Sequence, residues 1–436
     1  MTISVYPPYG SSSGDPVWVT FDNNNVDAFG RLRVSNPVTL FDGQSRFAAD
    51  NAYSYVTATG GTTSFNTNQS SVNLSVTTSS GSTAVSQTTR VFPYQPGKSL
   101  LMLQTFTMAA AQTNLRQRIG YFSAYNGVYF AQGEQTSASN LSFTIRTYTS
   151  GSVDNTRTVN QSAWNGDKLD GTGKSGITLD VTKTQILWFD IEWLGVGNVR
   201  CGFIINGEYI TCHTFQNANQ STSTKVYMQT AILPLRYEIA TTGTISSSAT
   251  LQMICSTVIS EGGYEQESQP FTARPGNNGI TIANNTGLTF TPIISMRVNS
   301  SYYGAIIIPA AILFQPTSNG STGYEVVLIR NATLTGATWA AGAISSSMVD
   351  TDTAATACTA TADNIVQTSF ANQSAQGVTN AVVPTGYNFD LQIGYTASLS
   401  GNGFGSSDTY TLAARGLNNS PVGSGTGAIS FYNLTV

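Results

Sequence analysis

Two acidic side chains two positions apart, Asp190 and Glu192, have the residue types and spacing best suited to chemistry. On a β-strand such positions share a face and lie about 7 Å apart, a separation that superficially suits the carboxylate pair of a glycosidase. Alternation produces the same pattern wherever one face of a sheet meets water. Trp188 shares that face, and an aromatic ring beside carboxylates can stack against a sugar. The segment is therefore a candidate glycan contact that need not hydrolyse its ligand.

Cys201 and Cys212 flank an Asn-Gly pair that predicts a hairpin. Asn206 and Gly207 stand between two β-rich runs, and a two-residue turn there requires positive φ at both positions. Counting outward from this turn places Cys201 directly opposite Cys212, with Cα atoms about 5.5 Å apart, which a disulfide tolerates. A structural disulfide, a redox pair and two reduced thiols packed as small apolar groups are all compatible with this spacing.

The single histidine, His213, excludes multi-histidine metal sites, and it excludes Ser-His and Cys-His triads unless it is itself the base. It is predicted to lie on the strand face that carries Tyr209 and Phe215, opposite to the face of Cys212. We interpret it as a partly buried structural residue, and we expect neither a metal nor a cofactor. Trp164, in a Trp-Asn-Gly-Asp segment, is interpreted as an exposed turn aromatic.

Three acids close together, Glu261, Glu265 and Glu267, could ligate a cation. No EF-hand-like loop surrounds them. We therefore expect a solvated turn there.

Charged residues make up 10% of the 436 residues, and the net charge is -4, whereas about 25% charged residues is usual. This balance argues against an extended phosphate-binding face, so no nucleic-acid partner is expected. The longest apolar run, 305–314, contains Pro309 and is about half the ~20 residues that span a bilayer. We expect a buried strand pair there and no membrane insertion. Residues 1–20 lack the features of a secretory signal peptide.

Short strands between turn signals dominate the chain, and no long amphipathic helical period is present. The fold class is therefore predicted to be all-β. The clearest stretch, 184–215, is expected to form a three-stranded meander. Further strands are predicted at 99–106, 120–130, 141–148, 225–233, 250–259, 279–286, 293–298, 305–314, 325–330, 388–398, 409–415 and 427–434.

A segment with two prolines and two glycines, 268–279, is the best candidate for a domain boundary. Beyond it the composition changes, because residues 270–436 contain no lysine, four arginines and six acids. We expect two β-sandwich or jelly-roll-like domains, at 46–269 and 270–436, preceded by an extended N-terminal arm at 1–45.

The segment 27–42, DAFGRLRVSNPVTLFD, resembles the N-terminal signature of a family of virion structural proteins from tailed bacteriophages, particularly marine and freshwater phages. Four further blocks are similar to segments of such proteins. These blocks are LWFDIEWLG at 187–195, LPLRYEI at 233–239, CSTVISEGGY at 255–264 and LIRNATLTGATW at 328–339. The resemblance implies a virion component and brings no catalytic residues with it.

Scarce charges tend to be paired, because the fork of an arginine matches a carboxylate. Arg236 and Glu238 are two residues apart in one of these blocks, and Asp27, Arg31 and Arg33 lie in the arm. We expect these charges to serve assembly, with Arg31 and Arg33 docking the arm onto acids of the main domain or of a neighbouring subunit.

The resulting expectation is a non-enzymatic structural protein, made in the host cytoplasm and displayed on the virion as a fibre, spike or decoration that contacts host-surface glycans. Its partners would be other virion proteins (capsid, portal or neck, or tail) and copies of itself, with a homotrimer as the expected oligomer. One alternative is a capsid cement protein without a ligand. Another is a tail spike that degrades glycans through Asp190 and Glu192.

Overall fold

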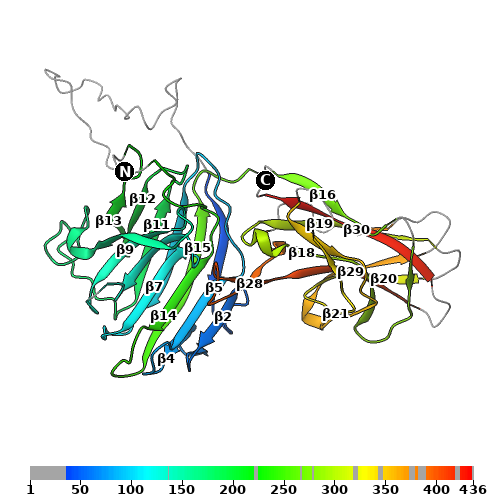
Figure 1. The fold of residues 1–436 in the computed structure, drawn as a ribbon, viewed down its shortest axis with the longest axis horizontal. Coiled ribbons are helices and arrows are strands. Elements are labelled where there is room, and N and C mark those ends of the chain that lie inside the picture. The colour runs from blue at the N-terminus through cyan, green and yellow to red at the C-terminus, as the bar shows by residue number, and fades with distance from the viewer. Residues whose placement is uncertain are drawn as a thin grey trace, which may run out of the picture.

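The computed structural model describes residues 36–135, 137–219, 224–265, 268–276, 279–317, 323–341, 347–372, 379–381, 389–417 and 423–434. Over these ranges the chain forms two groups of antiparallel sheets that lie side by side (Figure 1). One group uses the strands up to residue 260 and the other the strands from residue 269. The prediction of an all-β fold built from β-sandwiches is confirmed.

The first sandwich consists of an eight-stranded and a seven-stranded sheet. The eight-stranded sheet runs in the order β13 (Glu208–Phe215), β12 (Val199–Ile205), β11 (Gln185–Ile191), β6 (Leu100–Thr107), β15 (Ala249–Ser260), β4 (Ser71–Val76) and β3 (Thr62–Asn66), with β1 (Val38–Gln44) also paired to β15. The seven-stranded sheet runs in the order β10 (Asp154–Asn160), β9 (Leu141–Thr147), β8 (Gly127–Gln132), β7 (Leu115–Phe122), β14 (Leu235–Thr241), β5 (Thr83–Thr88) and β2 (Tyr53–Ala58).

Aromatic side chains from both sheets fill the space between them. On β6 every second residue is fully buried, as expected where one face of a strand covers a core. Phe143 lies at the centre, and its ring centroid is 5.4 Å from that of Phe130 in the same sheet and 6.0 Å from that of Phe189 in the facing sheet. Trp164 also packs on Phe143, with the centroids 4.7 Å apart. The expectation of an exposed Trp164 is therefore wrong, because its ring is only 2% exposed.

The second sandwich has a five-stranded and an eight-stranded sheet, with a small hairpin at one side. The five-stranded sheet contains β16 (Gln269–Ala273), β30 (Gly423–Asn433), β19 (Ile307–Pro316), β26 (Thr379–Ala381) and β17 (Ile280–Ile282). The eight-stranded sheet contains β21 (Thr333–Thr335), β24 (Ala357–Thr359), β18 (Thr289–Val298), β29 (Thr409–Gly416), β20 (Gly323–Arg330), β25 (Ile365–Asn372), β22 (Trp339–Ala340) and β23 (Val349–Asp352). The hairpin joins β27 (Tyr395–Ala397) to β28 (Phe404–Ser407).

Several strand predictions need correction. The run at 305–314 is one strand, β19, rather than a strand pair, and its pairing with β30 shifts register next to Pro309, which cannot donate to a ladder. The run at 120–130 is two strands, β7 and β8, joined by a turn at 123–126. The segment 225–233 forms no strand. By contrast, the meander of β11, β12 and β13 is confirmed, with φ of 55° at Asn206 and 82° at Gly207.

The β27–β28 hairpin connects the two sandwiches. It reaches from the second sandwich to strands β2 and β5 of the first (Figure 1). There Ala397 N donates to Ser54 Oγ at 2.9 Å, and Gln87 Nε2 donates to Gly403 O at 3.2 Å. Val91, from the first half of the chain, is buried in the core of the second sandwich. These contacts fix the two sandwiches relative to each other.

Candidate functional site

Strand β11 presents the predicted glycan-contact residues on the outer face of the eight-stranded sheet. Its neighbours Leu187 and Phe189 point into the core, so Trp188 and Asp190 point the other way. Trp188 is only 4% exposed, because Tyr209 packs against its ring at 5.6 Å. The exposed ring of this face is therefore Tyr209, which is 54% exposed.

Asp190 lies in a pocket of about 360 Å³ together with Arg200, Tyr209 and Glu261. The guanidinium of Arg200 pairs with Asp190 Oδ2, while the buried Oδ1 has no hydrogen-bond partner among the described residues. Burial raises the pKa of Asp190, although the charge of Arg200 partly offsets the effect. Glu192 follows the end of the strand, is exposed, and does not line this pocket. The pocket therefore contains Asp190 and Glu261, whereas Glu192 lies outside its lining.

The prediction that Cys201 lies directly opposite Cys212 is wrong, because a β-bulge interrupts the pairing of their strands. The pairing of β12 with β13 shifts register next to Cys201, which lies opposite His213 and not opposite Cys212. Both cysteines are buried, free thiols, and burial raises the pKa of each. The extra residue of a bulge also reverses the alternation of side chains beyond it.

His213 consequently lies beside Phe215 on the core side, and the predicted shared face with Tyr209 is wrong. The rings of His213 and Phe215 meet edge to face, with centroids 4.4 Å apart, and Nδ1 of His213 accepts a hydrogen bond from the backbone N–H of Asn165 at 3.3 Å. The imidazole is 7% exposed. Its surroundings therefore favour the neutral form.

We expect His213 to make the protein less stable as the pH falls from 6.5 to 4. Burial, with a smaller contribution from Arg157, lowers the pKa of His213 from 6.5 to about 4. Across this window the unfolded chain takes up a proton that the folded chain does not, so stability declines by roughly 1 kcal/mol per pH unit. Chemical denaturation of His213→Gln and the natural protein at several pH values checks this. If the difference in unfolding free energy between the variant and the natural protein does not change with pH, His213 is not the group responsible for the pH dependence.

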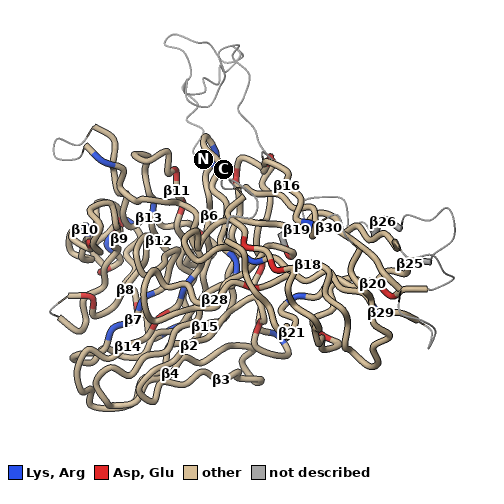
Figure 2. Tube along the Cα trace, turned by 45° about the vertical axis from the view of Figure 1, so that its right-hand side comes forward, with Lys and Arg blue, Asp and Glu red and all other residues tan. Residues whose placement is uncertain are grey.

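Arg236 and Glu238, predicted to be paired, form part of a buried ion cluster on the seven-stranded sheet. Glu238 Oε2 accepts from Arg236 Nη2 at 2.9 Å, and its Oε1 accepts from Arg118 Nη1 at 3.1 Å. Arg118 also holds Glu134 with two hydrogen bonds of 2.6 Å. Figure 2 shows how few charged residues the chain has and that several of both signs lie near its middle. Asp27, Arg31 and Arg33 of the arm lie outside the described residues, so their docking stays a prediction.

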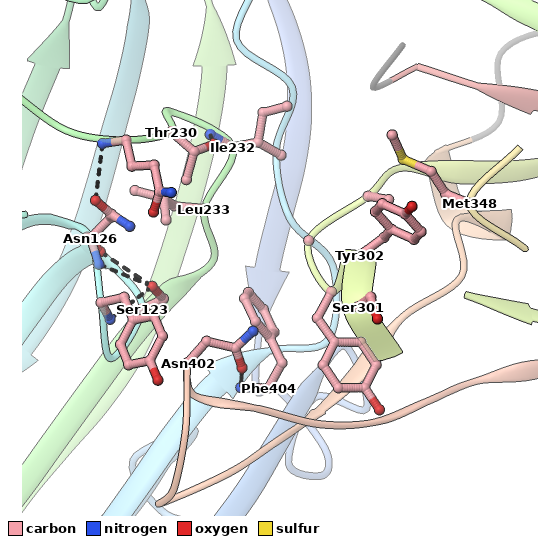
Figure 3. Close-up of a pocket in the computed structure, with 15 residues that line it drawn as sticks. Ser123, Asn126, Thr230, Ile232, Leu233, Ser301, Tyr302, Met348, Asn402 and Phe404 are labelled. Atoms are coloured by element: carbon pink, nitrogen blue, oxygen red, sulfur yellow. Dashed lines mark hydrogen bonds between the residues drawn. The ribbon is translucent and has the colours of Figure 1, made fainter. Parts of the chain in front are cut away.

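A cleft of about 400 Å³ lies between the two sandwiches (Figure 3). Its first wall is made of the turn between β7 and β8 and the segment before β14, which contribute Asn126 and Thr230. Its second wall carries Tyr302, and the β27–β28 hairpin closes one side with Asn402 and Phe404. The fifteen lining residues include no Lys, Arg, His, Asp or Glu. The cleft is therefore uncharged.

Two amide side chains in the cleft are held in fixed orientations. Asn126 Oδ1 accepts from the backbone N–H groups of Gln229 at 3.0 Å and Tyr148 at 3.3 Å. Asn402 Oδ1 accepts from the backbone N–H of Phe404 at 3.1 Å. Asn126 Oδ1 already accepts two hydrogen bonds and Asn402 Oδ1 accepts one, so each NH₂ group can donate to a ligand and Asn402 Oδ1 can accept one further hydrogen bond.

Tyrosine rings supply the apolar surface of the same cleft. Tyr302 is 50% exposed. Tyr125 stacks on Tyr148 with centroids 4.1 Å apart and planes within 4°, and Tyr303 meets Tyr395 edge to face at 5.6 Å. Rings of this kind offer a flat apolar face and a polar tip. Together with oriented amide donors they suit a neutral ligand that has both hydroxyl groups and an apolar ring face.

Sequence reasoning missed this cleft because its residues come from segments far apart in the chain. One local signal was present, since Asn126-Gly127 is a second Asn-Gly pair between apolar runs. It marks the turn that ends β7, where Gly127 has a φ of 141°. The other walls depend on how the two sandwiches dock, which no local pattern specifies.

Metal and membrane features can be stated for the described ranges. Over these ranges, no group of three or more His, Cys, Asp or Glu residues is placed to hold a metal ion. The same ranges contain no helix whose length and apolar character would let it cross a membrane.

No protein-family model and no curated protein matches the chain. Among solved structures, it is similar to an endo-β-1,4-glucuronan lyase from the fungus Trichoderma reesei, at 11% identity and a TM-score of 0.35 over 51% of this chain and 95% of that one. It is also similar to a Bacillus licheniformis β-glucanase, at 11% identity and a TM-score of 0.33 over 50% and 96%. A legume lectin-like domain from Entamoeba histolytica matches at 11% identity and a TM-score of 0.31 over 53% and 99%. These likenesses concern the arrangement of strands over about half of this chain.

Proposed function

We propose that this protein is a non-enzymatic structural component of a tailed-phage virion that binds neutral glycan chains in the cleft between its two sandwiches. The resemblance of segment 27–42 and the later blocks to virion proteins supports the virion assignment. The uncharged, tyrosine-lined cleft with its oriented amide donors supports the choice of ligand. This cleft is the observation that carries the proposal.

The chemistry of the cleft matches a neutral saccharide better than an ionic or a fully apolar ligand. A pyranose ring has an apolar face of C–H groups that can lie on tyrosine, and its hydroxyl and ring oxygens can accept from the NH₂ groups of Asn126 and Asn402. A charged ligand would find no counter-ion among the lining residues. A purely apolar ligand would leave the buried amide group of Asn126 unpaired.

Contacts between the sandwiches preorganise the cleft. The backbone carbonyl of Asn402 accepts from Ala124 N at 3.2 Å, so the turn of the first sandwich and the hairpin of the second are joined at the cleft itself. A binding site whose walls are fixed before binding loses less conformational entropy when the ligand arrives. The rigid connection between the domains therefore favours binding.

A screen of the full-length protein against neutral oligosaccharides, followed by titration of the best ligand, tests the glycan assignment. We expect Tyr302→Ala to weaken binding about tenfold or more, because it removes the exposed ring. Tyr209→Ala is the matched control, since this tyrosine is equally exposed but lies in the Asp190 pocket. If Tyr302→Ala binds the oligosaccharide as the natural protein does while Tyr209→Ala does not, the binding site is the Asp190 pocket on the outer face of the eight-stranded sheet. Release of reducing sugar that Asp190→Asn abolishes would contradict the non-enzymatic assignment.

The position on the particle requires a separate experiment. A gold-labelled antibody against residues 280–436, applied to intact particles and viewed by electron microscopy, should label projecting fibres or the tail tip if the protein is displayed for attachment. An even label over the head would favour decoration or cement. Absence of label from particles would contradict the virion assignment.

A further inference from the structure

A second pocket, of about 410 Å³, lies in the first sandwich and has a different character. It is lined by residues from β9 and β10 and from the segments that follow β13, including Arg157, Asn217, Lys225 and Tyr227. Two of its lining side chains are cationic, and Asp154 is its one acid. None of its lining residues belongs to the cleft between the sandwiches.

Arg157 differs from most arginines of this chain. It is half-buried, and its guanidinium lies over the ring of Phe215, with Cζ 5.6 Å from the centroid. The other half-buried arginines of the described ranges, among them Arg116 and Arg330, have a carboxylate partner. Over the described ranges, no carboxylate pairs with Arg157. A partly desolvated cation without a counter-ion is costly, so an anion in this pocket would be stabilised.

Tyr227 supplies a hydrogen-bond donor beside this cation. The side chain is 6% exposed, and its buried hydroxyl has no hydrogen-bond partner among the described residues. Burial raises the pKa of Tyr227 well above its ordinary value, so the hydroxyl keeps its proton. Tyr227 and Arg157 line the same pocket. An unpartnered buried hydroxyl is unfavourable unless a ligand or a water completes it.

Threonine hydroxyl groups also line the pocket, and one carboxylate oxygen of Asp154 already accepts a hydrogen bond. Thr147 and Thr149 line it and are hydrogen-bonded to each other at 3.2 Å between their Oγ1 atoms. Oδ1 of Asp154 already accepts from the backbone N–H of Thr156 at 2.7 Å. The pocket therefore combines these hydroxyl groups and the guanidinium of Arg157 with two acceptors, the carboxylate of Asp154 and Oδ1 of Asn217, which has no hydrogen-bond partner among the described residues.

We propose that this pocket binds an oxyanion, a sulfate or carboxylate group, through the guanidinium of Arg157 and the hydroxyl of Tyr227. Two N–H groups of an arginine fork can donate to two oxygens of a planar carboxylate or of a tetrahedral sulfate. Lys225 lines the same pocket, and the proposal depends on Arg157 and Tyr227 alone. The proposal is independent of the neutral-glycan cleft, and its ligand is either a free oxyanion or one carried on an acidic sugar.

Isothermal titration calorimetry of the full-length protein at constant ionic strength tests this site. The probes are sodium sulfate, methyl glucuronide, which carries a carboxylate, and methyl glucoside as its neutral counterpart. We expect saturable binding of sulfate, glucuronide or both, and none of the glucoside at this site. Arg157→Gln should weaken that binding about tenfold or more, and Tyr227→Phe about fivefold. Lys183→Gln, which removes an exposed charge elsewhere in the first sandwich, is the matched control and should leave it unchanged.

The outcomes separate the two sources of the oxyanion. Saturable binding of sulfate indicates a site for the free ion, whereas binding of the glucuronide alone indicates a site for an acidic sugar. Tyr227→Phe removes only one oxygen, so it keeps the test valid if Arg157→Gln fails to fold. Absence of saturable binding of either probe, or binding that both variants leave unchanged, would overturn the proposal. Neither outcome affects the Tyr302→Ala test of the neutral-glycan cleft.

Discussion

Replacing Glu238 by Gln should lower the free energy of unfolding of the first sandwich by about 3–5 kcal/mol, the cost of removing one partner from a buried ion pair. Glu238 is buried and lies within 2.9 Å of Arg236, 3.1 Å of Arg118 and 3.5 Å of Arg116. Without its charge, three arginines would share a desolvated region with Glu134 as the remaining acid of the cluster. Denaturant unfolding followed by tryptophan fluorescence measures the change, because Trp164, Trp188 and Trp193 all lie in this sandwich.

The pH dependence of the Glu238→Gln effect provides an internal check. Burial would raise the pKa of Glu238, but Arg236, Arg118 and Arg116 outweigh it and hold the pKa well below its usual range. A carboxyl group whose pKa is lower in the folded than in the unfolded protein stabilises the fold. This stabilisation is complete above the pKa of the unfolded state, about 4.3 for Glu, and is lost as the pH falls towards the pKa of the folded state. The difference between variant and natural protein should therefore shrink below about pH 4. Glu208→Gln, at an exposed acid in the same sandwich, should change stability by less than about 0.5 kcal/mol at any pH. A loss below about 1 kcal/mol for Glu238→Gln at pH 7 would contradict the role of the cluster.

Phe143→Ala should cost about 3–5 kcal/mol through lost burial and the cavity that it leaves. The ring of Phe143 is fully buried and contacts aromatic rings from both sheets and from the segment that carries Trp164. These neighbours are held by their own strands and can relax only partly into the space. The same unfolding measurement reports the effect, and near-ultraviolet circular dichroism should show loosened packing around Trp164.

Phe47→Ala is the matched control for this variant. Phe47 is 94% exposed, so the same truncation should change stability by less than about 0.5 kcal/mol. Equal effects of the two substitutions would show that Phe143 does not hold the sheets together.

The parts of the fold that depend on local pattern could be predicted from the sequence. Asn206 and Gly207 specify a hairpin by backbone conformation alone, and the alternation of β11 identifies which residues point outward. Trp164 was misassigned because its burial comes from Phe143, a residue of another strand that packs on it. The facing of Cys201 was mispredicted because a bulge adds one residue after a turn whose register was otherwise right.

The candidate site was less predictable than the fold. Trp188 and Asp190 were correctly placed on one face, but Tyr209 covers the tryptophan and Arg200 pairs with the acid. Neither interaction follows from spacing along a single strand. The cleft between the sandwiches combines a turn, a loop and a hairpin whose meeting depends on tertiary docking. Its uncharged character, however, agrees with the low charge of the whole chain.

The most direct test of the central claim is a crystal structure of the full-length protein with the neutral oligosaccharide that binds best in the screen. We expect a sugar ring in the cleft, against Tyr302 and within hydrogen-bond distance of the side-chain nitrogens of Asn126 and Asn402. An oligosaccharide bound instead in the pocket of Asp190 and Tyr209, with the cleft empty of sugar, would contradict it.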